Sequence, residues 1–284
     1  MKDENLPRVH GNLPLSCPRL TFLSRTFGGV MLRSICEELF RTDKQDPPRG
    51  PLSHRSPLHR DEDLTTLTHV YYRWRKILIS CPSLWTCLDC KNVDKTCVYL
   101  KRSKASALKI RLGEYLDEAF HLTIPYLGQL GSLSLLGSPD HLLNLTTHFE
   151  SHAPLLKTLS LTVASTRNLV LQDSIFGGNL SSLHELYLNG VITNLAWEDM
   201  SNPRTFDFSY VPSDKIPITQ LLHFFEHAPL LRKIRLYEAL PDFSDVPLGR
   251  MVPLPNLNSL VIRAHQAHTI VTNHSSIPTG ATII

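Results

Sequence analysis

One apolar template recurs along residues 130–265 and constrains the fold of this chain more than any other feature. The template is L-xx-L-x-L, with isoleucine in some places, and five clear copies of it begin at Leu130, Leu156, Leu183, Leu231 and Leu257. The starts are 26, 27, 48 and 26 positions apart, so the step of 48 leaves room for a further copy. The segment Pro203-Arg204-Thr205-Phe206-Asp207-Phe208 fits there, with phenylalanine in the two strand positions. We therefore expect six units.

The last two apolar positions of each unit alternate with polar ones, which is typical of a short strand with one buried face. A period in the twenties is that of leucine-rich repeats. Since one such unit cannot bury its apolar side alone, the units should stack, and each strand should pair in parallel with the next. The pattern predicts an α/β fold over residues 105–268, an irregular leucine-rich-repeat solenoid with parallel strands. No further unit is expected in the tail, residues 269–284.

Helix-like stretches lie between the expected strands, notably at residues 141–151 and 218–228. Proline precedes three of the strands and would stop a helix and feed an extended chain, because it lacks the N–H donor and restricts the residue before it. These prolines are Pro154, Pro229 and Pro255.

A separate helical region is expected at residues 61–104. Asp61-Glu62-Asp63 supplies acidic residues for a helix N-terminus, and apolar residues follow at helical spacing. This helix should run over residues 62–79 and end before Pro82. Residues 1–60 are poorly defined, with one amphipathic helix at 30–40 and a proline-rich linker at 47–57.

Two segments resemble the second half of F-box-like domains: residues 64–77, LTTLTHVYYRWRKI, and residues 81–86, CPSLWT. Residues 98–105 show a further, weaker similarity to these domains. Such domains read L-xx-V-C-R-x-W-R and then P-x-L-W, and the similarity is greatest to the expanded F-box families of fungi. The chain departs from this pattern at Tyr71, where cysteine is common, and at Tyr72, where arginine is frequent. The L-P-x-E-I/L-L-x-x-I-F opening of these domains is not clearly present.

The resemblance implies a substrate-recruiting subunit of a cullin-RING ubiquitin ligase, which binds the ligase adaptor, and through it the cullin scaffold, by apolar helix residues. On this chain they would be Leu64, Leu67, Val70, Trp74 and Ile77. The same stripe also suits packing against the repeats, so Trp74 fits either role, whereas Trp85 favours the core. The alternative is a non-catalytic leucine-rich-repeat scaffold with a degenerate F-box that no longer docks on a ligase.

The polar strand positions of the repeats would then face an unidentified target protein, unless they form an ordinary solvated surface. The residues expected to bind it are Ser134, Ser160, Glu185, Tyr187, Asp207, Lys233 and Arg235.

Motifs for catalysis and metal binding are poor in comparison. The chain has no GxGxxG, GxxxxGK[ST] or GxSxG string, so we expect no enzyme activity and no cofactor. Cys87-x-x-Cys90 has zinc-ligand spacing but no second pair follows it, and the six cysteines are expected to be thiols. His223 and His227 are one helical turn apart, but Phe224 breaks the HExxH pattern, so no metal site is expected.

Charge is distributed unevenly along the chain. Residues 1–112 carry 20 basic and 11 acidic side chains, and residues 113–284 carry 9 and 15. Because the basic residues are scattered, without a dense run or interleaved aromatics, we expect no nucleic-acid partner. Neither a signal peptide nor an apolar stretch of ~18 residues is present, which favours a cytoplasmic or nuclear protein without a membrane partner.

Overall fold

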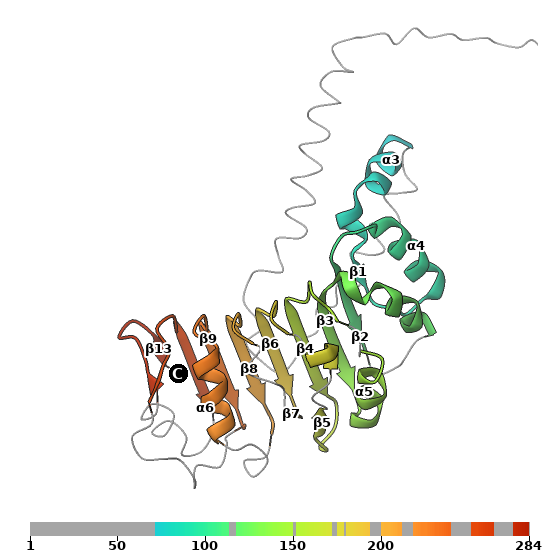
Figure 1. Cartoon of the computed structure of the whole chain (residues 1–284). Coiled ribbons are helices and arrows are strands. Elements are labelled where there is room, and N and C mark those ends of the chain that lie inside the picture. Colours follow the sequence, from blue (N-terminus) through green and yellow to red (C-terminus); the bar gives the residue numbers. More distant parts are fainter. Residues whose placement is uncertain are drawn as a thin grey trace, which may run out of the picture. The chain divides into compact units, whose positions relative to one another are not determined.

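The computed structural model describes residues 72–113, 118–149, 152–171, 175–178, 180–193, 200–211, 218–239, 251–263 and 275–283. These residues are coloured in Figure 1 and all fall in the second of two units of the chain, Thr66–Ile284. The helix expected at residues 30–40 and the proline-rich linker lie outside the described residues. The described part is a mixed α/β structure with a mostly parallel sheet.

The main sheet of the described residues has nine strands in the order β1-β2-β3-β4-β6-β8-β9-β11-β13, and every neighbouring pair is parallel. The strands are β1 (Cys87–Leu88), β2 (Leu108–Leu112), β3 (Leu130–Gly137), β4 (Thr158–Val163), β6 (Glu185–Asn189), β8 (Thr205–Ser209), β9 (Lys233–Tyr237), β11 (Ser259–Arg263) and β13 (Thr282–Ile283). The expected parallel pairing of successive units is confirmed. The unit inferred from the step of 48 is also confirmed, because β8 lies between β6 and β9.

Three strands of the sheet were not predicted. β1 and β2 precede the first copy of the template, and β13, two residues in the tail, pairs with β11. β2 alternates as the template does, with Ile110 and Leu112 aligned with Leu133 and Leu135, but Ala107 stands where the template begins with leucine. β1 and β13 have two residues each, which is too short for any periodicity.

The core lies against one face of the sheet, where equivalent apolar residues of successive strands are aligned in register. One such line is 0–1% exposed throughout and consists of Ile110, Leu133, Leu159, Leu186, Phe206, Ile234 and Leu260. Strict alternation explains this, because residues i and i+2 of a strand point to the same face.

Helical segments connect the strands. They are η3 (Glu118–Gln129), α5 (Pro139–Thr146), η4 (Ile175–Gly178) and α6 (Ile218–His227), and Figure 1 shows α5 and α6 on one side of the sheet. The helix expected at 218–228 is confirmed as α6, and the one expected at 141–151 is present as α5, which begins two residues earlier and ends at Thr146. The Ser138 hydroxyl caps α5 by accepting from the His141 N–H, 3.4 Å away, and Pro139 occupies the first turn, where no donor is needed. Two small parallel pairs complete the loops, β5 (Leu169–Leu171) with β7 (Val191–Thr193) and β10 (Val252–Pro253) with β12 (Ser275–Ser276).

The helical region consists of α3 (Tyr72–Ser80), η2 (Pro82–Trp85) and α4 (Val93–Ser103). As expected, α3 ends before Pro82. Trp85 joins the three elements: its Nε1 donates to the Leu78 carbonyl of α3 at 2.9 Å, and its ring meets Tyr99 of α4 edge-on at 5.0 Å. Trp85 is 2% exposed, so the expectation of a core role is confirmed. None of the described helices is long and apolar enough to cross a membrane.

Candidate partner-binding face

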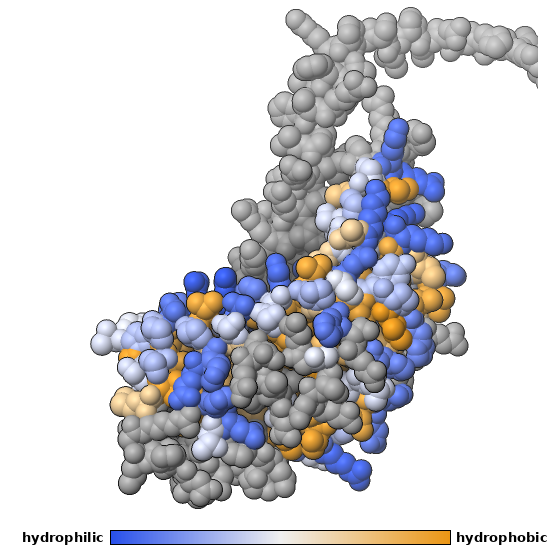
Figure 2. Space-filling view, in the orientation of Figure 1, coloured by the Kyte–Doolittle hydropathy of each residue, from blue (hydrophilic) through white to orange (hydrophobic). Residues whose placement is uncertain are grey.

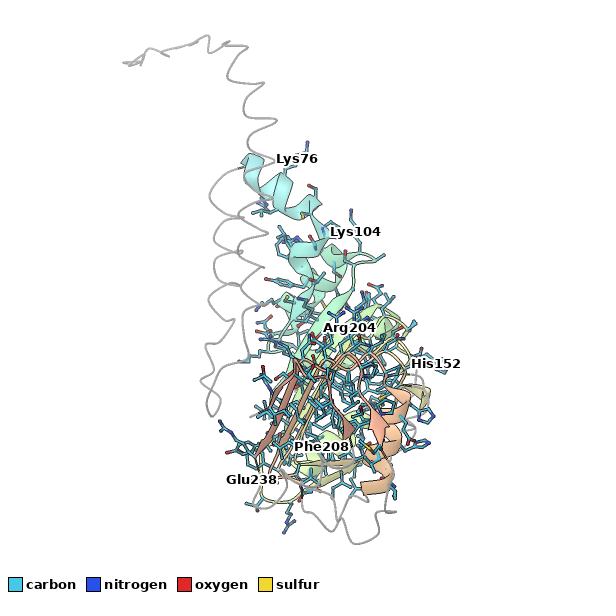
Figure 3. All side chains as sticks on the ribbon, turned by 90° about the vertical axis from the view of Figure 1, so that its left-hand side faces the viewer. Lys76, Lys104, His152, Arg204, Phe208 and Glu238 are labelled. Carbon is cyan, nitrogen blue, oxygen red and sulfur yellow. The ribbon has the colours of Figure 1, made fainter. Side chains whose placement is uncertain are left out.

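The strand side chains that do not enter the core form three rows across the sheet, which we call the polar sheet face. The rows follow from the strand register and run Lys109, Ser132, Thr158, Glu185, Thr205, Lys233, Ser259, then Arg111, Ser134, Ser160, Tyr187, Asp207, Arg235, Val261, then Leu136, Thr162, Asn189, Ser209, Tyr237, Arg263. All except Ser209 are half-buried or exposed. Figure 3 shows the sheet with Arg204, which precedes β8, and Glu238, which follows β9, at opposite ends of the strands.

All seven residues predicted to bind a target lie on this face. Five of them share the middle row, namely Ser134, Ser160, Tyr187, Asp207 and Arg235, and Glu185 and Lys233 share the neighbouring row. The prediction omitted others, of which Lys109, Arg111, Tyr237 and Arg263 are the largest. Alternation carried one position further along each strand would have found Tyr237 and Arg263, and the L-K-I-R-L alternation of β2 would have found the other two.

Tyr187 and Glu185 form a linked pair on β6. Glu185 Oε2 accepts from the Thr158 hydroxyl at 3.2 Å, and the Tyr187 phenol is hydrogen-bonded to the Glu185 carboxylate. Burial, the negative charges of Glu185 and Asp207 and this hydrogen bond raise the pKa of Tyr187 to about 12, although Arg235 opposes the shift. Tyr187 is therefore a neutral hydrogen-bond donor throughout the physiological range.

Asp207 and Arg235 form a loose ion pair between β8 and β9. Arg235 Nη1 lies 3.8 Å from Asp207 Oδ2, which is longer than the ~2.7–2.9 Å of a charge-assisted hydrogen bond. Burial raises the pKa of the Asp207 carboxyl, and the nearby Arg235 charge partly offsets that effect. Because a guanidinium has about five N–H donors and the Arg235 side chain is 35% exposed, it keeps donors for a partner.

Aromatic and cationic side chains meet at the carboxyl ends of β8, β9 and β11. The rings of Tyr210 and Tyr237 are 5.1 Å apart, and Arg263 Cζ lies 5.7 Å from the Tyr237 ring centroid. The backbone turns directly after β6, β8 and β9, with left-handed φ at Gly190, Tyr210 and Glu238. Strand pairing continues through these turns, because Gly190 N donates to Ser209 O and Tyr210 N to Tyr237 O, both at 2.8 Å. The turn thus holds Tyr210, 49% exposed, beside the polar sheet face.

The structure describes only two of the five predicted adaptor-binding residues. Leu64, Leu67 and Val70 lie outside the described residues, while Trp74 and Ile77 are residues of α3. The same helix exposes Arg75 and Lys76, and α4 exposes Val93 and Val98, each about 40% accessible. Figure 2 shows hydrophilic residues interspersed with hydrophobic ones over α3 and α4.

The histidines considered as metal ligands, His223 and His227, would have to lie in a group that could bind a metal ion. No group of three or more His, Cys, Asp or Glu in the described ranges is arranged to hold a metal ion. His223 and His227 are half-buried and face each other on α6 with ring centroids 4.2 Å apart, and His227 Nδ1 is 2.8 Å from the His223 carbonyl oxygen. The geometry of this pair is therefore accounted for by contacts within one helix.

Comparison of the chain with known proteins finds no matching family model, no matching curated protein and no matching solved structure. The chemistry of the polar sheet face and the sequence of the helical region therefore bear on function.

Proposed function

We propose that this chain recruits a target protein to a cullin-RING ubiquitin ligase. The helical region, as an F-box-like module, binds the ligase adaptor, and the strands form an irregular leucine-rich-repeat solenoid whose polar sheet face binds the target. The regular spacing supports the second part, since the equivalent core residues Leu133, Leu159 and Leu186 are 26 and 27 positions apart and aligned in register.

The observation that carries the proposal is the continuity of the polar sheet face. It crosses seven adjacent strands from β2 to β11, and at about 4.8 Å between strands it extends roughly 29 Å. Repeat arrays use such extended surfaces to bind other macromolecules. A long face of hydroxyl, amide, aromatic and charged groups suits the surface of another protein better than a small substrate.

The support for ligase docking comes from the helical region. The F-box-like string at residues 64–86 spans α3 and η2, and the P-S-L-W part of that string is η2 itself. Trp85 packs inside this region, so the proposal assigns adaptor binding to Trp74 and Ile77 of α3 rather than to Trp85.

The mechanism would be proximity rather than chemistry. A subunit that holds the ligase at one end and the target at the other raises the effective concentration of target lysines near the ubiquitin-charged enzyme. The proposal assigns no acid, base, nucleophile or metal to this chain.

A pull-down with the purified ligase adaptor tests the proposal. We expect the full-length chain to retain the adaptor and a Trp74→Ala, Ile77→Ala double variant to lose it. The matched control is Arg75→Ala, Lys76→Ala on the same helix, which changes exposed charges and should keep binding. Circular dichroism must show that all three proteins are folded.

Absence of adaptor binding by the folded wild type would exclude ligase docking. The second candidate function would then stand, a repeat scaffold that binds a partner through the polar sheet face alone. The L-P-x-E opening is not clearly present in the sequence, and this departure favours the second candidate.

A further inference from the structure

Charge on the polar sheet face is separated by strand. The polar positions of β6 and β8 carry Glu185 and Asp207 and no basic residue, which we call the acidic strip. The polar positions of β9 and β11 carry Lys233, Arg235 and Arg263 and no acidic residue, which we call the basic strip. Lys233 and Arg263 are exposed, so their charges face solvent.

The two strips do not neutralise each other by close pairing. The ion pair between Asp207 and Arg235 is long at 3.8 Å. Glu185 is instead hydrogen-bonded by Thr158 on β4, which lies on the side of β6 away from the basic strip. Arg263 lies over the ring of Tyr237, where a cation is held weakly and keeps its N–H donors. Both strips therefore retain the capacity to pair with charges of opposite sign on a partner.

We propose that the polar sheet face binds an extended segment of a target protein that crosses the strands, with a basic residue over the acidic strip and an acidic residue over the basic strip. The inference rests on the proposed function, because it specifies the target that the face would bind.

Strand spacing sets the distance between the two charges of the bound segment. Glu185 on β6 and Lys233 on β9 share a row and are separated by β8 alone, so these two charges of opposite sign are about 9.6 Å apart. An extended chain advances about 3.3 Å per residue. The basic and acidic residues of the segment should consequently be about three positions apart, in a basic-x-x-acidic or acidic-x-x-basic arrangement.

Each of the two strips also contains a tyrosine. Tyr187 lies in the middle row beside Asp207, and Tyr237 lies between Arg235 and Arg263, with Tyr210 next to it. The Tyr187 phenol is uncharged at physiological pH, so it does not repel an acidic residue. These rings offer apolar contact for the two intervening residues of the segment, whereas the charges fix its register.

Selection from a phage-displayed library of random 12-residue peptides at low salt tests the inference. We compare the full-length wild type with a Lys233→Glu, Arg235→Glu variant, which reverses two charges of the basic strip. The matched control is Lys109→Glu, Arg111→Glu, which makes the same charge change at the same two rows on β2. Circular dichroism checks the folding of each protein.

We expect the wild type and the β2 control to enrich peptides with opposite charges three positions apart, and the β9 variant to lose this preference. A selected peptide, labelled with a fluorophore, should bind the β9 variant about tenfold more weakly and the β2 control within about twofold of wild type. Enrichment without a preferred spacing, enrichment of acidic residues alone, or equal losses in both variants would overturn the inference.

The outcome is separable from that of adaptor docking. The adaptor pull-down depends on Trp74 and Ile77 of α3, whereas peptide selection depends on β9. Peptide binding by a chain that does not bind the adaptor keeps this inference and rejects the ligase role. Adaptor binding by a chain that selects no peptide pattern keeps the ligase role and rejects this inference.

Discussion

Replacement of Phe206 tests whether residues 203–209 form a repeat strand. The Phe206 side chain is 1% exposed, and its ring centroid lies 4.7 Å from Phe224 and 6.2 Å from Phe225 of α6. Phe206→Ala removes the ring from a site closed by other rings and leaves a cavity, so we expect a loss of about 3–5 kcal/mol in the free energy of unfolding. This is a large part of the ~5–15 kcal/mol that stabilises a typical domain. Urea unfolding followed by circular dichroism measures it.

Two further variants make this measurement decisive. Phe206→Leu keeps an apolar side chain of similar size and should recover most of the loss. Val170→Ala changes a side chain that is 59% exposed on β5 and should shift the free energy by less than about 0.5 kcal/mol. If Phe206→Ala costs no more than Val170→Ala, then β8 does not pack against α6, and the reading of the step of 48 as two units is refuted.

Two other predictions concern the turns and the titration of the polar sheet face. Gly190→Ala should lower the free energy of unfolding by about 1–2 kcal/mol, because φ is +68° and an added Cβ would meet Val163 Cβ at 3.1 Å. The control is Gly128→Ala, where an added Cβ would meet nothing within 4 Å. Equal urea midpoints for the two variants would contradict the expectation. The pKa of Tyr187 rises from 10.0 in the unfolded chain to about 12 in the fold, so between these values the unfolded chain releases this proton first, and wild-type stability should fall as pH rises. Unfolding of Tyr187→Phe should depend less on pH over that window, and identical slopes would show that Tyr187 is not buried beside Glu185 and Asp207.

The sequence alone determined which residues form the repeated strands and which of their faces enters the core. The reason is that alternation with period two is a local property: Leu159 and Leu161, or Phe206 and Phe208, must share a face whatever the strand pairs with. The ends of α3 at Ser80 and of α6 before Pro229 were likewise predictable from the local sequence, because proline lacks the N–H that helix continuation needs. All seven predicted target-binding residues lie on one face for the same reason.

Only the tertiary structure decided which of these residues are neighbours. Asp207 and Arg235 are 28 positions apart, and their contact depends on the register between β8 and β9, which no local pattern specifies. The short strands β1 and β13 owe their existence to the parallel edges they join, since two residues have no periodicity of their own. The raised pKa of Tyr187 and the separation of acidic and basic strips arise in the same way, because burial and charge proximity are properties of strands brought together by stacking and not of any one segment.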